Sequence, residues 1–428
     1  MKKKFLTSIL MIIMLLAPIS VYADGEVTFK YNKDEQKVLE NVPSIGCKAA
    51  YIAEPSTGKI IYEKNAHEKL YPASTTKILT ALVVMEKCQL TDKAKVSSKA
   101  ISLVPDGYSN ANLKVGEEID IKTLLYALLI PSANEAANVL AEHVSGSVED
   151  FANLCNTRAK ELGCENLHFV NPNGIHNSDH YFTAYDLYLI AKECQKHDVF
   201  NEIVKTTSFT VPATNIYTKN DRTFKNTNYM ILPNYKSYYY EYCTGIKTGT
   251  TTPAGECLVA SSSHNNIDLI SVVLDGGTNS KGLSERFYDT KQLFEFAYKN
   301  YTLKEIANKE QTITNINVKH ATKETESLDI KAENNISTIV PNDIDNIRQE
   351  VSVEKNISAP IEQGQVLGQV TFYADGLNYT TNLVASHSVE KLPYWLYNTI
   401  VIVVALIILM ILKRKKKRSR RRKKTNVR

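Results

Sequence analysis

Three short motifs that lie far apart in this chain must meet in space if they act together, and this requirement constrains the fold more than any other feature. They are Ser74–Lys77 (STTK), Ser132–Asn134 (SAN) and Lys247–Gly249 (KTG). Together they supply a nucleophilic hydroxyl, an amine base, a second hydroxyl and an anion-binding cation, the equipment of a serine acyl enzyme. Ser-x-x-Lys recurs by chance, for example at Ser56–Lys59, whereas Lys-Thr-Gly occurs once. The combination and its order therefore carry the functional prediction.

The first motif stands at the start of a predicted helix. After Pro72, the segment Thr75–Lys87 has apolar residues at the spacing of a buried helix, which puts Ser74 at its N-terminus. Ser74 and Lys77 are three residues apart, so their side chains lie on one face within hydrogen-bond reach. A lysine can take the serine proton only if its pKa is lowered, as burial and a second cation would do. We expect Lys247 to be that cation, and the helix N-terminus to favour developing negative charge.

The other two motifs supply a proton carrier and an anion site. Ser132 and Asn134 lie on a predicted turn between two helices, from which their side chains can project into a cleft. The Ser132 hydroxyl can pass a proton towards a leaving amine, and the Asn134 amide can hold a substrate carbonyl or fix Lys77. In the third motif Lys247 and Thr248 can hold a carboxylate, while Gly249 lets the backbone approach the substrate closely.

The pattern around the motifs predicts an α/β sandwich, a sheet flanked by helices, with a helical middle part. Strands from both ends of this region can contribute to one sheet. We expect strands at Ala49–Ala53, Ile60–Tyr62, Leu258–Ser261 and Asp268–Leu274, and helices at Asp120–Ile130, Asn134–Val144, Ala184–Lys196 and Ser284–Tyr298.

The residue pattern changes after residue 303. Short runs rich in Thr, Ile and Val alternate with turns such as Glu362–Gly364 and Ala374–Gly376, with a strand-like Val366–Phe372 between them. This pattern is typical of a small all-β domain. We therefore expect a catalytic domain at residues 24–303 and a β domain at residues 304–391.

Both ends of the chain have the pattern of targeting segments. Lys2–Lys4 precede an apolar run and small residues up to Ala23, so we expect a cleaved signal peptide at residues 1–23. Leu392–Leu412 carries no charge and is long enough for a transmembrane helix. The basic residues 413–428 follow, which predicts a cytoplasmic tail. The expected product is a single-pass protein of the cell membrane with its catalytic domain outside the cytoplasm.

Charge and cysteine usage exclude several classes of function. The basic runs at residues 2–4 and 413–428 carry more positive charge than the formal net charge of +5, so the expected exported part is acidic and nucleic acid is not an expected partner. The cysteines are odd in number and lack C-x-x-C spacing, which predicts neither a disulfide framework nor a zinc site. No His-Glu-x-x-His pattern occurs, and we expect no metal and no cofactor. The seven cysteines are Cys47, Cys88, Cys155, Cys164, Cys194, Cys243 and Cys257.

These motifs with their flanks resemble the low-molecular-mass penicillin-binding proteins, the serine-type D-alanyl-D-alanine carboxypeptidases of peptidase family S11. The resemblance extends over most of the region between the two ends, and Ala359–Val384 is similar to the C-terminal β domain of that family. It implies a β-lactamase/transpeptidase-like α/β domain with a helical subdomain, followed by an all-β domain. The matching stretches are Tyr71–Lys77, Pro131–Ala136, Asn171–Gly174, His180–Asp186 and Thr244–Gly249.

The resemblance also implies residue roles. Ser74 would be the acyl-ester nucleophile, Lys77 its proton acceptor and Ser132 a second proton-handling residue. The substrate would be the D-alanyl-D-alanine end of a peptidoglycan pentapeptide, and β-lactam antibiotics would acylate the same serine. The backbone N–H groups of residues 74 and 250 would form the oxyanion hole. The residues implied in substrate binding are Asn134, Lys247, Thr248, Gly249 and Thr250.

Two other functions use the same motifs. A class A β-lactamase shares the logic but needs a deacylating glutamate, and it usually has no second β domain or C-terminal anchor. A non-catalytic penicillin sensor would need an effector domain, for which the short basic tail has no room. Cleavage of peptidoglycan cross-links would use the same residues as D-alanine release.

Overall fold

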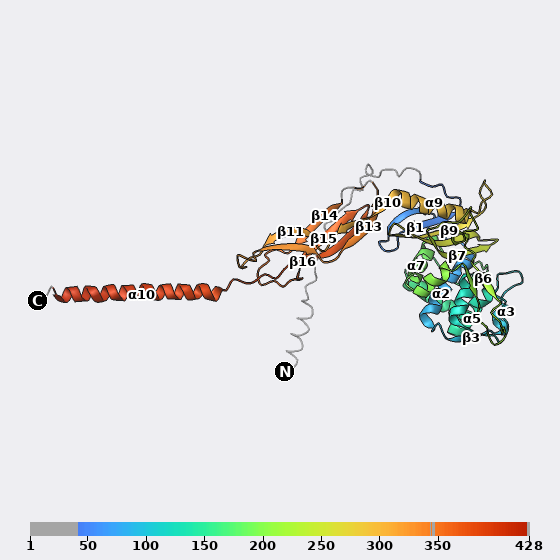
Figure 1. The fold of residues 1–428 in the computed structure, drawn as a ribbon, viewed down its shortest axis with the longest axis horizontal. Helices are drawn as coiled ribbons and strands as arrows, with labels where there is room; N and C mark the ends of the chain where they lie inside the picture. Colours follow the sequence, from blue (N-terminus) through green and yellow to red (C-terminus); the bar gives the residue numbers. More distant parts are fainter. Residues whose placement is uncertain (1–41, 343, 345–346, 426–428) are drawn as a thin grey trace, which may run out of the picture. The chain divides into compact units, whose positions relative to one another are not determined.

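The structure is a computed structural model that describes residues 42–342, 344 and 347–425. The predicted signal peptide, residues 1–23, lies outside the described residues, as do residues 426–428 of the predicted tail. The described chain forms an α/β domain, then a β domain, then a long helix (Figure 1).

A five-stranded antiparallel sheet organises the α/β domain, with the order β2-β1-β9-β8-β7. Strands from the beginning and the end of the domain share this sheet, as the sequence predicted, because β1 pairs with β9 from Ala49–Leu274 to Ala53–Ile270. The strands are β1 (Ala49–Ala53), β2 (Ile60–Lys64), β7 (Cys243–Thr251), β8 (Gly255–His264) and β9 (Ile267–Gly276).

Helices cover both faces of the sheet. Helix α9 (Glu285–Asn300) packs on β8 and β9, and α7 (Ala184–Cys194) packs on β1 and β9 from the other side (Figure 1). The predicted helices are all present, within a few residues of their expected bounds. The helical part also contains α3, α6 and α8, which the sequence pattern did not predict. Its helices are α2 (Lys77–Lys87), α3 (Ser98–Ser102), α4 (Ile121–Leu129), α5 (Asn134–Ser145), α6 (Val148–Glu161) and α8 (Asp198–Lys205).

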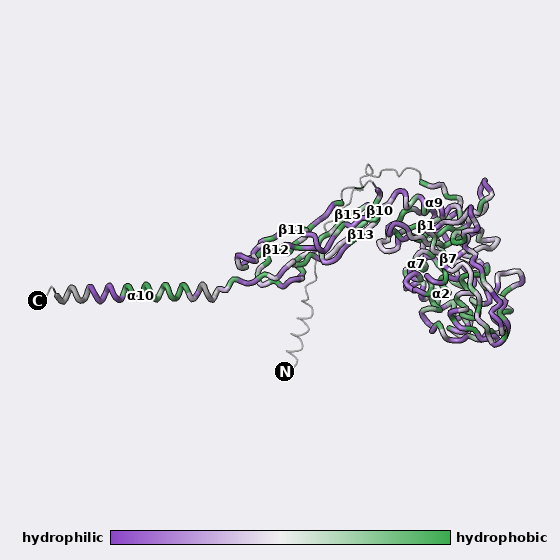
Figure 2. Tube along the Cα trace, in the orientation of Figure 1, coloured by the Kyte–Doolittle hydropathy of each residue, from purple (hydrophilic) through white to green (hydrophobic). Residues whose placement is uncertain are grey.

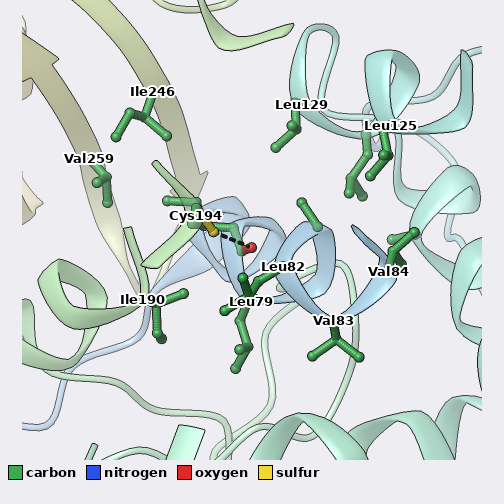
Figure 3. Packing of buried hydrophobic residues seen from close by; sticks show 14 of the residues in the cluster. Leu79, Leu82, Val83, Val84, Leu125, Leu129, Ile190, Cys194, Ile246 and Val259 are labelled. Carbon is green, nitrogen blue, oxygen red and sulfur yellow. Dashed lines mark hydrogen bonds between the residues drawn. The ribbon is translucent and has the colours of Figure 1, made fainter. Parts of the chain in front are cut away.

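Helix α2 lies at the centre of the apolar core. Leu79, Leu82 and Val83 are buried, and Figure 3 shows them between side chains of α4, α7 and the strands. Complete burial explains why apolar residues surround this helix rather than forming one stripe. The thiol of Cys194 donates to the carbonyl of Ile78 at 3.5 Å within this core. The first turn of α2 is thereby held rigidly beneath the sheet.

Short elements complete the α/β domain. The turn η2 (Ala73–Thr76) leads into α2, and η3 (Tyr229–Ile231) precedes β7. Two two-stranded sheets lie outside the main sheet. They are formed by β3 (Lys93–Lys95) with β4 (Glu118–Asp120) and by β5 (Ser208–Thr210) with β6 (Thr223–Lys225).

The C-terminal β domain begins directly after α9, and its first strand spans the predicted boundary between residues 303 and 304. A five-stranded sheet has the order β11-β12-β16-β15-β14, and β10 pairs separately with β13. The strands are β10 (Tyr301–Ala307), β11 (Thr312–Asn317), β12 (Ser327–Ala332), β13 (Ile336–Pro341), β14 (Arg348–Val353), β15 (Val366–Ala374) and β16 (Leu377–Ala385).

The C-terminal helix α10 (Tyr394–Thr425) contains an apolar stretch followed by a hydrophilic one (Figure 2). Among the described residues, no helix has the length and apolar character needed to cross a bilayer. The prediction of a transmembrane helix at Leu392–Leu412 is therefore not supported. Helix α10 instead continues without interruption from the apolar residues into the basic ones after Leu412.

All seven cysteines are free thiols, and five of them are buried. Burial raises the pKa of Cys194 well above its ordinary value, so this thiol stays protonated in the core. The cysteines thus act as small apolar side chains. Within the described ranges, no group of three or more His, Cys, Asp or Glu side chains is arranged to hold a metal ion.

Candidate active site

The three motifs meet beside the first turn of α2. Ser74 lies in η2, Ser132 and Asn134 lie at the junction of α4 and α5, and Lys247 lies on β7. The sheet and the helical part therefore each supply one side of the site. Ser74 is partly exposed, whereas Lys77 and Lys247 are almost completely buried.

The Lys77 amine is held by three oxygen atoms. Its Nζ lies 3.0 Å from Ser74 Oγ, and it donates to Asn134 Oδ1 at 2.8 Å and to the Asn173 carbonyl at 2.5 Å. The last two oxygens can only accept hydrogen bonds. A neutral amine that donates its two protons to them keeps a lone pair for the Ser74 hydroxyl. This geometry fits the base predicted from the sequence.

Burial and charge favour the neutral amine. Burial lowers the pKa of Lys77 well below its ordinary value, and the Lys247 cation lowers it further, as predicted. The Glu135 carboxyl group acts in the opposite direction. Burial likewise lowers the pKa of Lys247, to about 7, with a contribution from the Arg286 guanidinium. Lys247 is therefore adjusted to gain or lose a proton near neutral pH, and the neutral form of Lys77 is favoured.

Ser132 stands next to this cluster without a hydrogen-bond partner among the described residues. Its hydroxyl is buried, and its backbone has a φ of 65°, in the left-handed region. Such a conformation is rare for a residue with a side chain and is typical of functional turns. The hydroxyl is free to bond a bound molecule, but the structure does not join it to Ser74 or Lys77.

The third motif lies on β7, next to the nucleophile turn. Lys247 Nζ donates to the Thr248 carbonyl at 2.9 Å, and the Thr248 hydroxyl lies 2.6 Å from that of Thr227. Thr250 is exposed at the end of the motif. Its hydroxyl accepts a hydrogen bond of 2.7 Å from Arg286.

The structure requires glycine at position 249 for a reason that the sequence did not indicate. A Cβ built on Gly249 would lie 2.9 Å from the backbone nitrogen of Ser74 and 3.0 Å from that of Thr75. The missing side chain thus allows β7 to press against the nucleophile turn. The close approach occurs within the protein, between β7 and the turn that carries Ser74.

The loop Asn171–Gly174, for which the sequence predicted no role, completes the site. The carbonyl of Asn173 binds Lys77, and Gly174 follows with a φ of +81°. A Cβ on Gly174 would lie 1.9 Å from the Ala73 carbonyl oxygen, so only glycine fits there. The Asn-Pro-Asn-Gly turn pattern could have indicated a tight loop, but the contact with Lys77 has no sequence signal.

His180 supports the same turn from behind. The Thr76 hydroxyl donates to the Ala73 carbonyl, so it accepts from His180 Nε2, which lies 2.8 Å away. The N–H of Val170 donates to His180 Nδ1 at 2.9 Å. The ring is therefore neutral, and burial lowers its pKa to about 3. His180 thus ties the nucleophile turn to the segment around Val170.

Arg286 is a further residue that the motifs did not identify. It lies in the first turn of α9 and donates to the Gly249 carbonyl at 2.9 Å, to the Thr250 hydroxyl, and to Glu256 at 3.3 Å. A guanidinium group at the end of the Lys-Thr-Gly strand strengthens the positive potential of the site. One arginine within a predicted helix carries no sequence signal for this placement.

The comparisons with known proteins agree with this geometry. A sequence profile described as D-alanyl-D-alanine carboxypeptidase matches residues 36–278. A second, described as the C-terminal domain of penicillin-binding protein 5, matches residues 301–391.

Individual proteins are similar over most of the chain. A Bacillus subtilis protein named D-alanyl-D-alanine carboxypeptidase DacF is 34% identical over 87% of this chain and 91% of its own length. The solved structure of penicillin-binding protein 5 from Haemophilus influenzae has a TM-score of 0.65 at 26% identity, covering 82% of this chain and 99% of that one. A regulatory factor of peptidoglycan synthesis from Streptococcus pneumoniae, PBP3, has a TM-score of 0.67 at 26% identity, covering 81% and 100%.

Proposed function

Because this chain belongs to the D-alanyl-D-alanine carboxypeptidase family of serine hydrolases and is itself such a carboxypeptidase, we propose that Ser74, Lys77 and Ser132 carry its reaction. The substrate is the D-alanyl-D-alanine end of a peptidoglycan pentapeptide. The observation that carries the assignment is the Lys77 amine, which two carbonyl oxygens orient so that its lone pair faces Ser74 Oγ.

Acylation begins with proton transfer from Ser74 to the neutral Lys77 amine. The serine oxygen attacks the carbonyl carbon between the two D-alanines, and the N–H groups of residues 74 and 250 stabilise the resulting oxyanion. The contact of Gly249 with the nucleophile turn supports this arrangement of the two N–H groups. The C–N bond then breaks, and an ester with Ser74 remains.

The leaving amine needs a proton, which Ser132 is suited to deliver. Its unpartnered, buried hydroxyl can accept the proton that Lys77 took and donate its own to the departing nitrogen. Water then hydrolyses the ester by the reverse path, which regenerates Ser74. A β-lactam ring acylates the same serine.

The terminal carboxylate binds at the Lys-Thr-Gly strand. Lys247 supplies positive charge, the hydroxyl groups of Thr248 and Thr250 donate, and Gly249 keeps the strand close to the nucleophile turn. Of the two roles predicted for Asn134, we assign it the fixing of Lys77. The Lys77 amine donates to its Oδ1, and its Nδ2 donates to the Ser109 carbonyl. It orients the base more than it binds the substrate.

Replacement of the nucleophile tests this assignment. Purified full-length Ser74→Ala protein should neither release D-alanine from a diacetyl-L-lysyl-D-alanyl-D-alanine peptide nor retain labelled benzylpenicillin. Thr75→Ser, a neighbour whose hydroxyl donates to the Pro72 carbonyl, is the matched control and should do both. Release of D-alanine by Ser74→Ala would contradict the role of Ser74, and rapid hydrolysis of penicillin without peptide cleavage by the natural protein would contradict the choice of substrate.

The reaction is proposed to take place outside the cytoplasm, at the cell membrane. Support comes from the signal-peptide pattern at residues 1–23 and from the substrate, which lies outside the membrane. Protease added to intact cells stripped of their wall should degrade the catalytic domain. Recovery of the protein, intact and with residue 1 present, in the cytoplasmic fraction would contradict this location.

A further inference from the structure

We propose that Glu135 is a positioning residue that sets the proton occupancy of Lys77, acting through its own charge and through the segment Ser109–Leu113. This inference rests on the proposed role of Lys77 as the base. Glu135 follows Asn134 in the first turn of α5 and is only 3% exposed.

Glu135 first acts mechanically, by holding the segment Ser109–Leu113 against α5. Glu135 Oε1 accepts a hydrogen bond of 2.6 Å from the N–H of Ala111. Two residues earlier, the Ser109 carbonyl accepts from both the backbone N–H and the Nδ2 of Asn134, at 3.0 and 2.9 Å. The segment is thus fastened to α5 at two adjacent points. Because Ser109 takes the amide nitrogen of Asn134, the amide oxygen is left to face Lys77.

Glu135 also acts electrostatically, through the charge of its carboxyl group. Glu135 Oε2 is buried and accepts no hydrogen bond from the described residues. A buried carboxylate oxygen without a donor is costly, and burial accordingly raises the pKa of Glu135. The charged groups that act on Lys77 are Lys247 of β7 and Glu135 of α5, with opposite signs. Lys77 in turn acts on Glu135.

Glu135 and Lys77 therefore each favour the charged form of the other. An ionised Glu135 favours the ammonium form of Lys77, which cannot accept the Ser74 proton. A neutral residue at position 135 removes that attraction while Lys247 continues to oppose the ammonium. The Lys77 amine should then be neutral, and able to accept the Ser74 proton, at a lower pH.

The decisive variant is Glu135→Gln, whose side-chain oxygen can still accept from Ala111. We expect the acidic limb of the pH profile for acylation by benzylpenicillin, and of kcat/KM for D-alanine release, to move to lower pH by at least half a unit. The plateau rate should stay within about threefold of the natural protein. Glu135→Ala, which also releases Ala111, should lower the plateau at least tenfold.

Glu142→Gln is the matched control, because Glu142 lies on the same helix, accepts from Ser97 at 2.6 Å and does not act on Lys77. Its pH profile should coincide with that of the natural protein. An unshifted acidic limb in a folded Glu135→Gln protein, with a cooperative thermal transition, would overturn the inference. That result leaves the proposed function intact if the natural protein releases D-alanine and Ser74→Ala does not.

Discussion

The two domains of this protein differ in what they bury. The α/β domain buries charged side chains beside its apolar core, among them Lys77, Glu135 and Lys247. In the described part of the C-terminal β domain, the buried polar side chains are the hydroxyls of Thr338 and Thr381. Burying a charge is costly, so a chain tolerates it where chemistry requires it. The difference indicates that the α/β domain accepts unfavourable burial for catalysis, whereas the described part of the β domain buries no charged side chain.

The largest effect is expected from Lys77→Met. Loss of the base should lower D-alanine release at least about 1000-fold. The free energy of unfolding should change by less than about 2 kcal/mol, because removal of a buried amine offsets the loss of the donor to Asn134 and Asn173. Steady-state kinetics and urea unfolding would measure the two quantities. Lys87→Met, at the exposed end of the same helix, should leave both unchanged, and a large loss of stability in Lys77→Met would contradict the comparison.

The converse result is expected for Leu383→Ala in the β domain. Leu383 is fully buried on β16, and its truncation should cost about 3 kcal/mol of that domain's stability. D-alanine release per folded molecule should stay within about twofold. Asn378→Ala, at an exposed position on the same strand, is the matched control variant and should leave both quantities unchanged. A large fall in kcat for Leu383→Ala at a temperature where the protein is folded would assign the β domain a part in catalysis.

A smaller effect is expected on the free energy of unfolding, which should depend on pH through the titration of His180. Its pKa is about 3 in the folded chain and 6.5 when unperturbed, so the unfolded chain binds more protons between these values. The contribution of neutral His180 to the free energy of unfolding is complete above pH 6.5. It is lost as the pH falls, by about 2 kcal/mol at pH 5.

His180→Gln sharpens this test, because an amide can donate to Thr76 and accept from Val170 without titrating. Urea midpoints measured from pH 8 to pH 4 should fall less steeply in this variant than in the natural protein. Equal slopes would show that His180 is not the group responsible.

Local pattern was sufficient for much of the fold. The spacing of apolar residues predicted α2, α4, α5, α7 and α9, because a buried helix face repeats with the period of the helix. Alternation and turn residues predicted strands β1, β2 and β15. The same approach did not predict α3, α6 and α8, and the apolar run at Leu392–Leu412 led to a membrane span that the structure does not support.

By itself, the sequence determined the chemical groups of this protein: a serine and a lysine on one helix turn, a Ser-x-Asn turn and a single Lys-Thr-Gly strand. Spacing of three residues was enough to bring Ser74 and Lys77 together, since the helix itself sets that distance. Only the tertiary structure decided which distant atoms surround Lys77, namely the Asn173 carbonyl, the Asn134 amide and the Glu135 carboxyl group. These contacts depend on how loops and helices pack across the domain, and packing is long-range, so no local pattern encodes it.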